Sequence, residues 1–81
     1  MRFIDIPIMW MTQEMAELND LGIEFSYDGF ATKVVGLNIG NIDYFFEDED
    51  PRYTCIVMDS GNELVTNIPF LEFKRKLQFA A

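Results

Sequence analysis

The sequence predicts an α+β domain: a small antiparallel sheet of five to six strands, one inserted helix at about residues 13–21 and a C-terminal helix at about residues 69–79. Short stretches rich in β-branched and aromatic residues alternate with turn signals, as in strands. Two other stretches carry apolar residues at helical spacing. With 81 residues, 49% of them apolar, the chain suffices for one compact domain, residues 1–81.

The C-terminal third organises the predicted fold. Residues 53–58 are β-branched and aromatic, as in a buried strand, and residues 63–66 return as its hairpin partner. Gly61, in the turn between them, is free to adopt positive φ. The helix that follows has one apolar face, which we expect to pack against these strands. This face consists of Phe70, Phe73 and Leu77.

The ends of this helix also carry signals. Pro69 suits a first helical turn, where its missing N–H would have no partner. Three basic residues are expected in the last turns, where cations are favoured by the negative end of the helix dipole. They are Lys74, Arg75 and Lys76.

The N-terminal half begins with an alternating stretch, residues 2–10, that predicts a strand. One face of this strand is formed by Ile4, Ile6, Ile8 and Trp10. Thr12 and Gly22 fit the two caps of the inserted helix. Asp28-Gly29 then predicts a tight hairpin between residues 23–27 and residues 30–37.

The middle of the chain predicts a bend, a strand and an acidic loop. Gly36 and Gly40 flank the expected bend or bulge. Residues 42–46 form a further strand. Residues 47–52 read Glu-Asp-Glu-Asp-Pro-Arg, which favours a solvated loop because adjacent acids suit neither a sheet nor a core.

Charge carries the most information about function. The chain has fourteen acidic residues and six basic ones, which gives a net charge of −8. All the acids lie within residues 3–73, which include only two of the bases. Such a surface repels nucleic-acid phosphates and attracts basic protein surfaces, so we expect a protein partner with a basic surface and no direct binding to nucleic acid.

Several function classes are disfavoured. Because the chain has no histidine, it cannot form a Ser-His or Cys-His catalytic pair or a histidine-ligated metal site. The glycines match no phosphate-binding loop, and the acids lack the EF-hand spacing. We therefore expect no enzymatic activity, no cofactor and no metal site.

The compartment is expected to be the cytoplasm. No stretch approaches the apolar length of a membrane span, and the N-terminal stretch lacks the pattern of a signal peptide. The single cysteine, Cys55, cannot form an internal disulfide, which suits a reducing compartment. Because it lies in a predicted strand, we interpret it as a small buried apolar residue, with a reactive thiol as the alternative.

Two candidate interaction sites follow. The first is acidic and consists of Asp43, Glu47, Asp48, Glu49 and Asp50. It could present carboxylates to a cluster of Arg and Lys side chains, as expected of an inhibitor or regulator that occupies a nucleic-acid-binding surface, like phage-encoded anti-defence proteins. A plain solvated loop is the alternative. The second candidate is an adaptable patch of Trp10, Met11 and Met15, for which packing within the domain is the alternative.

A family resemblance covers about half of the chain. The residues that carry it are Leu37, Asn38, Ile42, Asp43, Tyr44, Thr54, Ile56, Gly61, Val65, Glu72 and Leu77. Over residues 37–77 this pattern resembles the small FlbD-like flagellar family, also seen in phage and bacterial proteins. The resemblance implies a hairpin-plus-helix fold and, as an alternative function, a structural or regulatory accessory role. It supplies no catalytic residues.

Overall fold

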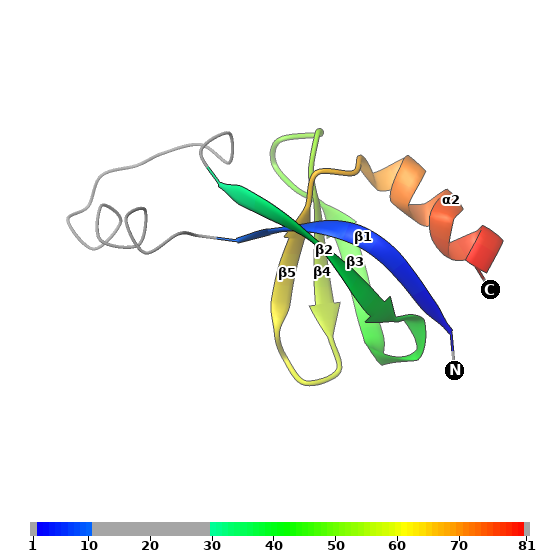
Figure 1. The fold of residues 1–81 in the computed structure, drawn as a ribbon. Helices are drawn as coiled ribbons and strands as arrows, with labels where there is room; N and C mark the ends of the chain where they lie inside the picture. Colours follow the sequence, from blue (N-terminus) through cyan, green and yellow to red (C-terminus); the bar gives the residue numbers. More distant parts are fainter. Residues whose placement is uncertain (1, 11–29, 81) are drawn as a thin grey trace.

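The computed structural model describes residues 2–10 and 30–80 (Figure 1). In chain order the elements are β1 (Phe3–Trp10), β2 (Ala31–Asn38), a 3-10 turn η2 (Ile39–Asn41), β3 (Ile42–Glu47), β4 (Thr54–Met58), β5 (Glu63–Thr66) and the helix α2 (Phe70–Ala80). The helix predicted at residues 13–21, the strand predicted at residues 23–27 and the Asp28-Gly29 turn lie outside the described residues.

The five strands form one antiparallel sheet in the order β2-β1-β5-β4-β3. This arrangement, with its C-terminal helix, confirms the α+β class. The hairpin of β4 and β5 turns at Gly61, which has a φ of 91°, as its position predicted. The N-terminal strand β1 is an interior strand, between β2 and β5, and β5 is the central one.

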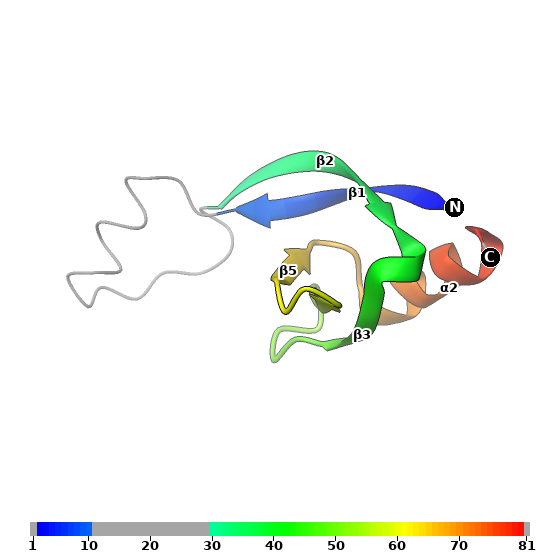
Figure 2. The same cartoon turned by 90° about the horizontal axis from the view of Figure 1, so that it is seen from below.

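The sheet curls because of the connection between β2 and β3. These strands occupy opposite edges, yet the three residues of η2 join them. Four strand spacings of about 4.8 Å would separate the edges of a flat sheet by about 19 Å, whereas the four extended steps from Asn38 to Ile42 span at most about 14 Å. The sheet must therefore bend until the ends of β2 and β3 meet. Figure 2 shows the result, with β1 and β2 arching over β3 and β5.

Hydrogen bonds hold η2 against both halves of the sheet. The Ile39 amide donates to the Arg2 carbonyl at 2.9 Å, at the start of β1. The Asn41 carbonyl accepts from the Asp59 amide at 2.8 Å, just after β4. Within the turn, the Asn38 side chain accepts from the Gly40 amide at 3.1 Å. The bend predicted between Gly36 and Gly40 is therefore displaced toward the C-terminus, because β2 continues through Gly36 to Asn38 and the chain turns at residues 39–41.

The pairing of β3 with β4 contains one irregularity. Ile42 is opposite Met58 and Tyr44 is opposite Val57, so Asp43 is the extra residue of a β-bulge. The turn at Ile39–Asn41 and the bulge at Asp43 are therefore separate features, one before β3 and one within it.

The concave side of the sheet and α2 enclose the core. Phe73 is fully buried, while Phe70 and Leu77 are half-buried, so the predicted apolar face of the helix does pack inward. The Phe45 ring lies 5.4 Å from the Phe70 ring and 5.1 Å from the Phe73 ring. The buried cluster consists of Ile6, Ile8, Leu37, Ile56, Ile68 and Phe73.

Two buried threonines link the strands to neighbouring segments. Thr54 and Thr66 face each other across β4 and β5, and both are fully buried. Thr54 donates its hydroxyl to the Ile68 carbonyl at 2.7 Å, and Thr66 donates to the Pro7 carbonyl at 2.6 Å. Among the described residues, no buried side-chain nitrogen or oxygen lacks a partner.

The C-terminal helix, predicted at about residues 69–79, is confirmed at Phe70–Ala80. It begins at Phe70, and the Pro69 carbonyl accepts the first helical bond from the Phe73 amide at 2.9 Å. It extends to Ala80, so the basic residues 74–76 lie in the middle of the helix and the last turn contains none. The placement of these cations at the helix terminus was wrong. Arg2 from the β1 end instead donates to the Ala80 carbonyl at 2.9 Å.

The described part of the chain contains no helix with the length and hydrophobicity needed to traverse a lipid bilayer.

We expect Phe73→Ala to lower the free energy of unfolding by about 3–5 kcal/mol, because it leaves a cavity at the centre of the core. Chemical denaturation measures this loss. Leu71→Ala is the matched control, since Leu71 is on the same helix but 67% exposed, and its stability should change by less than about 1 kcal/mol. Equal losses in the two variants would contradict the packing described here.

We expect Gly61→Ala to destabilise the domain by about 1–2 kcal/mol, because an L side chain is disfavoured at positive φ. No atom lies within 4 Å of the position of the new Cβ, so the loss would come from the backbone alone. Ser60→Ala, in the same exposed turn, serves as the control in thermal denaturation. A Gly61→Ala variant as stable as the wild type would show that the turn tolerates another conformation.

Candidate protein-interaction site

The acidic residues selected from the sequence lie along β3 and in the loop that follows it. Asp43 is at the bulge, and Glu47 is the last residue of the strand. Asp48, Glu49 and Asp50 lie in the loop between β3 and β4. All five therefore occupy one edge of the sheet and its continuation.

Two of these acids, Asp48 and Asp50, use their carboxylates in hydrogen bonds within the loop and to β4. The Asp48 side chain accepts from the Asp50 amide at 3.2 Å and from the Cys55 thiol at 3.3 Å. The Asp48 amide donates to the Tyr53 carbonyl at 3.1 Å, and the Tyr53 amide donates to the Asp50 carbonyl at 3.0 Å. These bonds fold the loop back on itself, so Asp48 acts as a structural residue.

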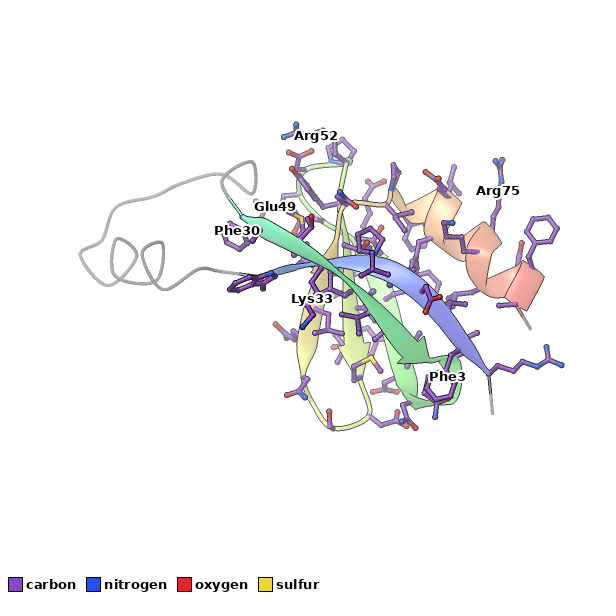
Figure 3. The ribbon with its side chains drawn as sticks, viewed as in Figure 1. Phe3, Phe30, Lys33, Glu49, Arg52 and Arg75 are labelled. Carbon is purple, nitrogen blue, oxygen red and sulfur yellow. The ribbon has the colours of Figure 1, made fainter. Side chains whose placement is uncertain are left out.

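Asp50 is neutralised within the loop. Its carboxylate pairs with the Arg52 guanidinium at 2.7 Å and also accepts from the Arg52 amide at 3.1 Å. The side-chain hydrogen bond from Arg52 is the main reason why the pKa of Asp50 is lowered. The Arg52 guanidinium also lies 5.2 Å from the centre of the Tyr53 ring. In Figure 3, Arg52 marks the end of the loop farthest from the β4–β5 turn.

The other three acids are directed to solvent. Asp43, Glu47 and Glu49 are exposed, and none makes a side-chain hydrogen bond or ion pair with another residue of the described ranges. We call these three residues the outward acids. Of the five carboxylates selected from the sequence, they are the ones available to a partner.

Two aromatic residues of β3 lie beside the outward acids. Tyr44 and Phe46 are 54% and 47% exposed, and their rings are stacked with centres 6.2 Å apart. Because Phe45 between them contacts the helix, and successive strand residues point to opposite faces, both rings project from the convex side. We call Tyr44 and Phe46 the convex aromatic pair.

Tyr44 and Phe46 were not among the candidate residues selected from the sequence. A signal was available: three successive aromatic residues, 44–46, in a predicted strand must place at least one ring on each face of the sheet. Only one face can be covered by the single helix that follows the sheet.

The apolar surface continues inward from this pair. Tyr44 is opposite Val57, and Phe46 is opposite Cys55, which is in turn opposite Val65 on β5. Val57 is buried, whereas Cys55 and Val65 are partly exposed. The convex side of β3 and β4 is thus apolar, and by the same alternation Glu47 lies on the opposite face, with Phe45.

The thiol of Cys55 is unsuited to nucleophilic chemistry. Burial, followed by the hydrogen bond to Asp48, raises the pKa of Cys55 from 9.0 to about 11. At neutral pH the sulfur therefore remains protonated.

The second candidate site is only partly described. Trp10 is half exposed at the end of β1, whereas Met11 and Met15 lie outside the described residues. The alternation predicted for β1 holds for Ile6 and Ile8, which are buried. It does not extend to the strand's end, where Met9 is buried and Trp10 is not, because the sheet no longer lies over the helix there.

A hollow of about 430 Å³ opens where η2 meets the β4–β5 turn. Its floor is apolar and its rim is polar, with Asp59 as its one ionisable side chain. The residues that line it are Leu37, Asn41, Met58, Asp59, Ser60, Asn62 and Leu64. A single solvated carboxylate offers no acid–base pair. Within residues 2–10 and 30–80, no three Cys, Asp or Glu side chains are grouped so as to hold a metal ion.

Comparison of the chain with family models, with curated proteins and with solved structures found no match. The resemblance to the FlbD-like family over residues 37–77 therefore stays a prediction.

We expect the environment of Cys55 to make stability depend on alkaline pH. Because the thiol's pKa is raised in the folded state, its contribution is complete below about pH 9 and is lost as the pH rises towards 11. The measurement is the difference in unfolding free energy between the wild type and Cys55→Ala from pH 8 to 11, which cancels the titration of other groups. A difference that stays constant over this range would contradict the raised pKa.

Proposed function

We propose that this chain is a non-enzymatic, cytoplasmic protein-binding module that occupies a basic surface of a partner protein. The observation that carries the proposal is the contrast within its acidic segment. Asp48 and Asp50 hold the loop in one conformation, while the outward acids are exposed and unneutralised. β3 and the loop that follows it therefore present carboxylates at defined positions, Asp43 and Glu47 from the strand and Glu49 from the loop.

The outward acids suit recognition of Arg and Lys side chains. Charge-assisted hydrogen bonds between carboxylates and guanidinium groups are about twice as strong as neutral ones. Since Asp43 and Glu47 belong to a strand paired with β4, little backbone conformational freedom is lost when they bind. The net charge of −8 would also accelerate encounter with a basic protein.

The proposed partner uses its basic surface for nucleic acid. Such surfaces gather Arg and Lys side chains to contact phosphates, and carboxylates on a rigid frame would compete for the same groups. The function would then be inhibition or regulation of a nucleic-acid-binding protein, as for phage-encoded anti-defence proteins. The module itself would bind neither nucleic acid nor membranes.

The test compares two charge variants. The first, Asp43→Asn/Glu47→Gln/Glu49→Gln, neutralises the outward acids. The control, Asp5→Asn/Asp59→Asn/Glu72→Gln, removes the same charge from exposed positions elsewhere. Partners captured from the source cells by the wild type are purified, and association is then measured for all three proteins.

We expect the first variant to associate about tenfold more slowly or worse, and the control to remain within about threefold of the wild type. Wild-type binding should weaken as salt rises past about 0.15 M, where charges are screened beyond about 8 Å. Equal rates for the two variants would refute the assignment of the outward acids. Binding that is insensitive to both charge and salt would refute the proposed function.

A further inference from the structure

The outer edge of β3 has features of a strand-addition site. Among the described residues, β3 pairs with β4 alone and is the edge strand of the sheet. An edge strand carries outward-facing N–H and C=O groups that can pair with another extended chain. In β3 this edge lies directly beside the convex aromatic pair.

A second copy of this chain is a poor occupant of this edge. Asp43 and Glu47 lie near the two ends of the six-residue strand. Antiparallel pairing of two β3 strands would bring these carboxylates from both copies together, and like charges on paired strands are destabilising. The net charge of −8 on each chain adds to the repulsion. The same charges favour a cationic occupant.

We propose that the edge of β3 binds an extended segment of the basic partner that alternates arginine with an apolar residue, added as a further antiparallel strand. This inference rests on the proposed function and names the segment through which the partner is recognised. Backbone hydrogen bonds would supply affinity, and the side chains on the two faces would supply selectivity.

On the convex face, the arginines would lie against the aromatic pair. Side chains directly opposite each other on paired strands are about 4.5–5.5 Å apart at Cβ, so residues opposite Tyr44 and Phe46 reach their rings. A guanidinium stacks on an aromatic face and can still donate hydrogen bonds in its own plane. Asp43, at the bulge, provides an acceptor near the start of the strand, whereas Glu47, at its end, shares the face of Phe45 by the same alternation. Lysine, a compact and strongly hydrated charge, fits this surface less well.

On the concave face, the occupant needs an apolar side chain. Phe45 is partly exposed and contacts Phe70 and Phe73 on the helix. A residue opposite Phe45 would therefore extend the core at its edge. Since the two faces of the added strand differ, the preferred sequence has a period of two.

The experiment titrates the full chain with synthetic peptides and follows its backbone amide signals by NMR. The first peptide is a ten-residue alternation of arginine and valine. A second replaces arginine with lysine. A third keeps every side chain of the first but is N-methylated at alternate backbone amides, so that it loses donors without losing charge.

We expect the arginine peptide to shift the amide signals of residues 43–47 and to protect from hydrogen exchange those amides that point away from β4. The N-methylated peptide should bind at least about tenfold more weakly, and the lysine peptide several-fold more weakly. Tyr44→Ala/Phe46→Ala should also lose about tenfold in affinity. Phe3→Ala/Phe79→Ala, which removes two exposed rings from other elements, should bind like the wild type. The amide spectra show whether each variant is folded.

Three outcomes would overturn the inference. Equal affinity for the first and third peptides would show that charge acts without strand pairing, and the proposed function would survive. Amide signal shifts confined to residues 48–52 would likewise show that the peptide binds by charge without pairing to β3. Protection, before any peptide is added, of the β3 amides that point away from β4 would show that the edge is already occupied, with or without a dimer in sedimentation. The two proposals can also separate in the other direction. If Tyr44→Ala/Phe46→Ala weakens peptide binding but neutralising the outward acids does not slow partner association, the strand-addition site stands and the proposed function fails.

Discussion

The structure depends on one short connection, the three residues of η2 that join strands at opposite edges of the same sheet. A flat sheet cannot satisfy this connection, so β2 and β3 must approach each other at one end. The resulting curl gives the sheet a concave side, which the core and α2 fill, and a convex side. Bonds from Ile39 to the start of β1 and from Asp59 to Asn41 fix the turn to both halves. As a result, one face of β3 packs on the core and the other lies on the convex side.

The curl divides the aromatic residues of β3 between two roles. Phe45 packs against the helix, whereas Tyr44 and Phe46 project from the convex side. The bulge at Asp43 lets the strand leave η2 and still pair with β4 in register. β3 therefore contributes to the core with one face and carries the proposed interaction surface on the other. In the same way, the next segment uses Asp48 and Asp50 for its own shape and leaves Glu47 and Glu49 outside.

The sequence predicted the parts of the fold that local patterns determine. The β4–β5 hairpin, the positive φ of Gly61 and the apolar face of α2 follow from residues close together in the chain. The pairing of β1 with β5 joins residues such as Met9 and Val65, and no local pattern specifies it. The five candidate acids were assigned to one site because the sequence does not show which carboxylates bond within the loop and which face solvent. Only the loop geometry distinguishes Asp50, which pairs with Arg52, from Glu49, which is exposed.

Two of the outward acids, Asp43 and Glu47, counteract the tendency to self-associate that the convex aromatic pair gives to the edge of β3. An exposed apolar edge strand promotes pairing between copies of the same chain, and proteins commonly prevent this with charges and bulges at the edge. Here Asp43 supplies both, and Glu47 adds a second charge. Because these charges are all negative, they oppose self-association without opposing a cationic partner. The same carboxylates can thus keep the edge of β3 open and select what binds there, which explains why an acidic surface and an aromatic surface would occupy one strand.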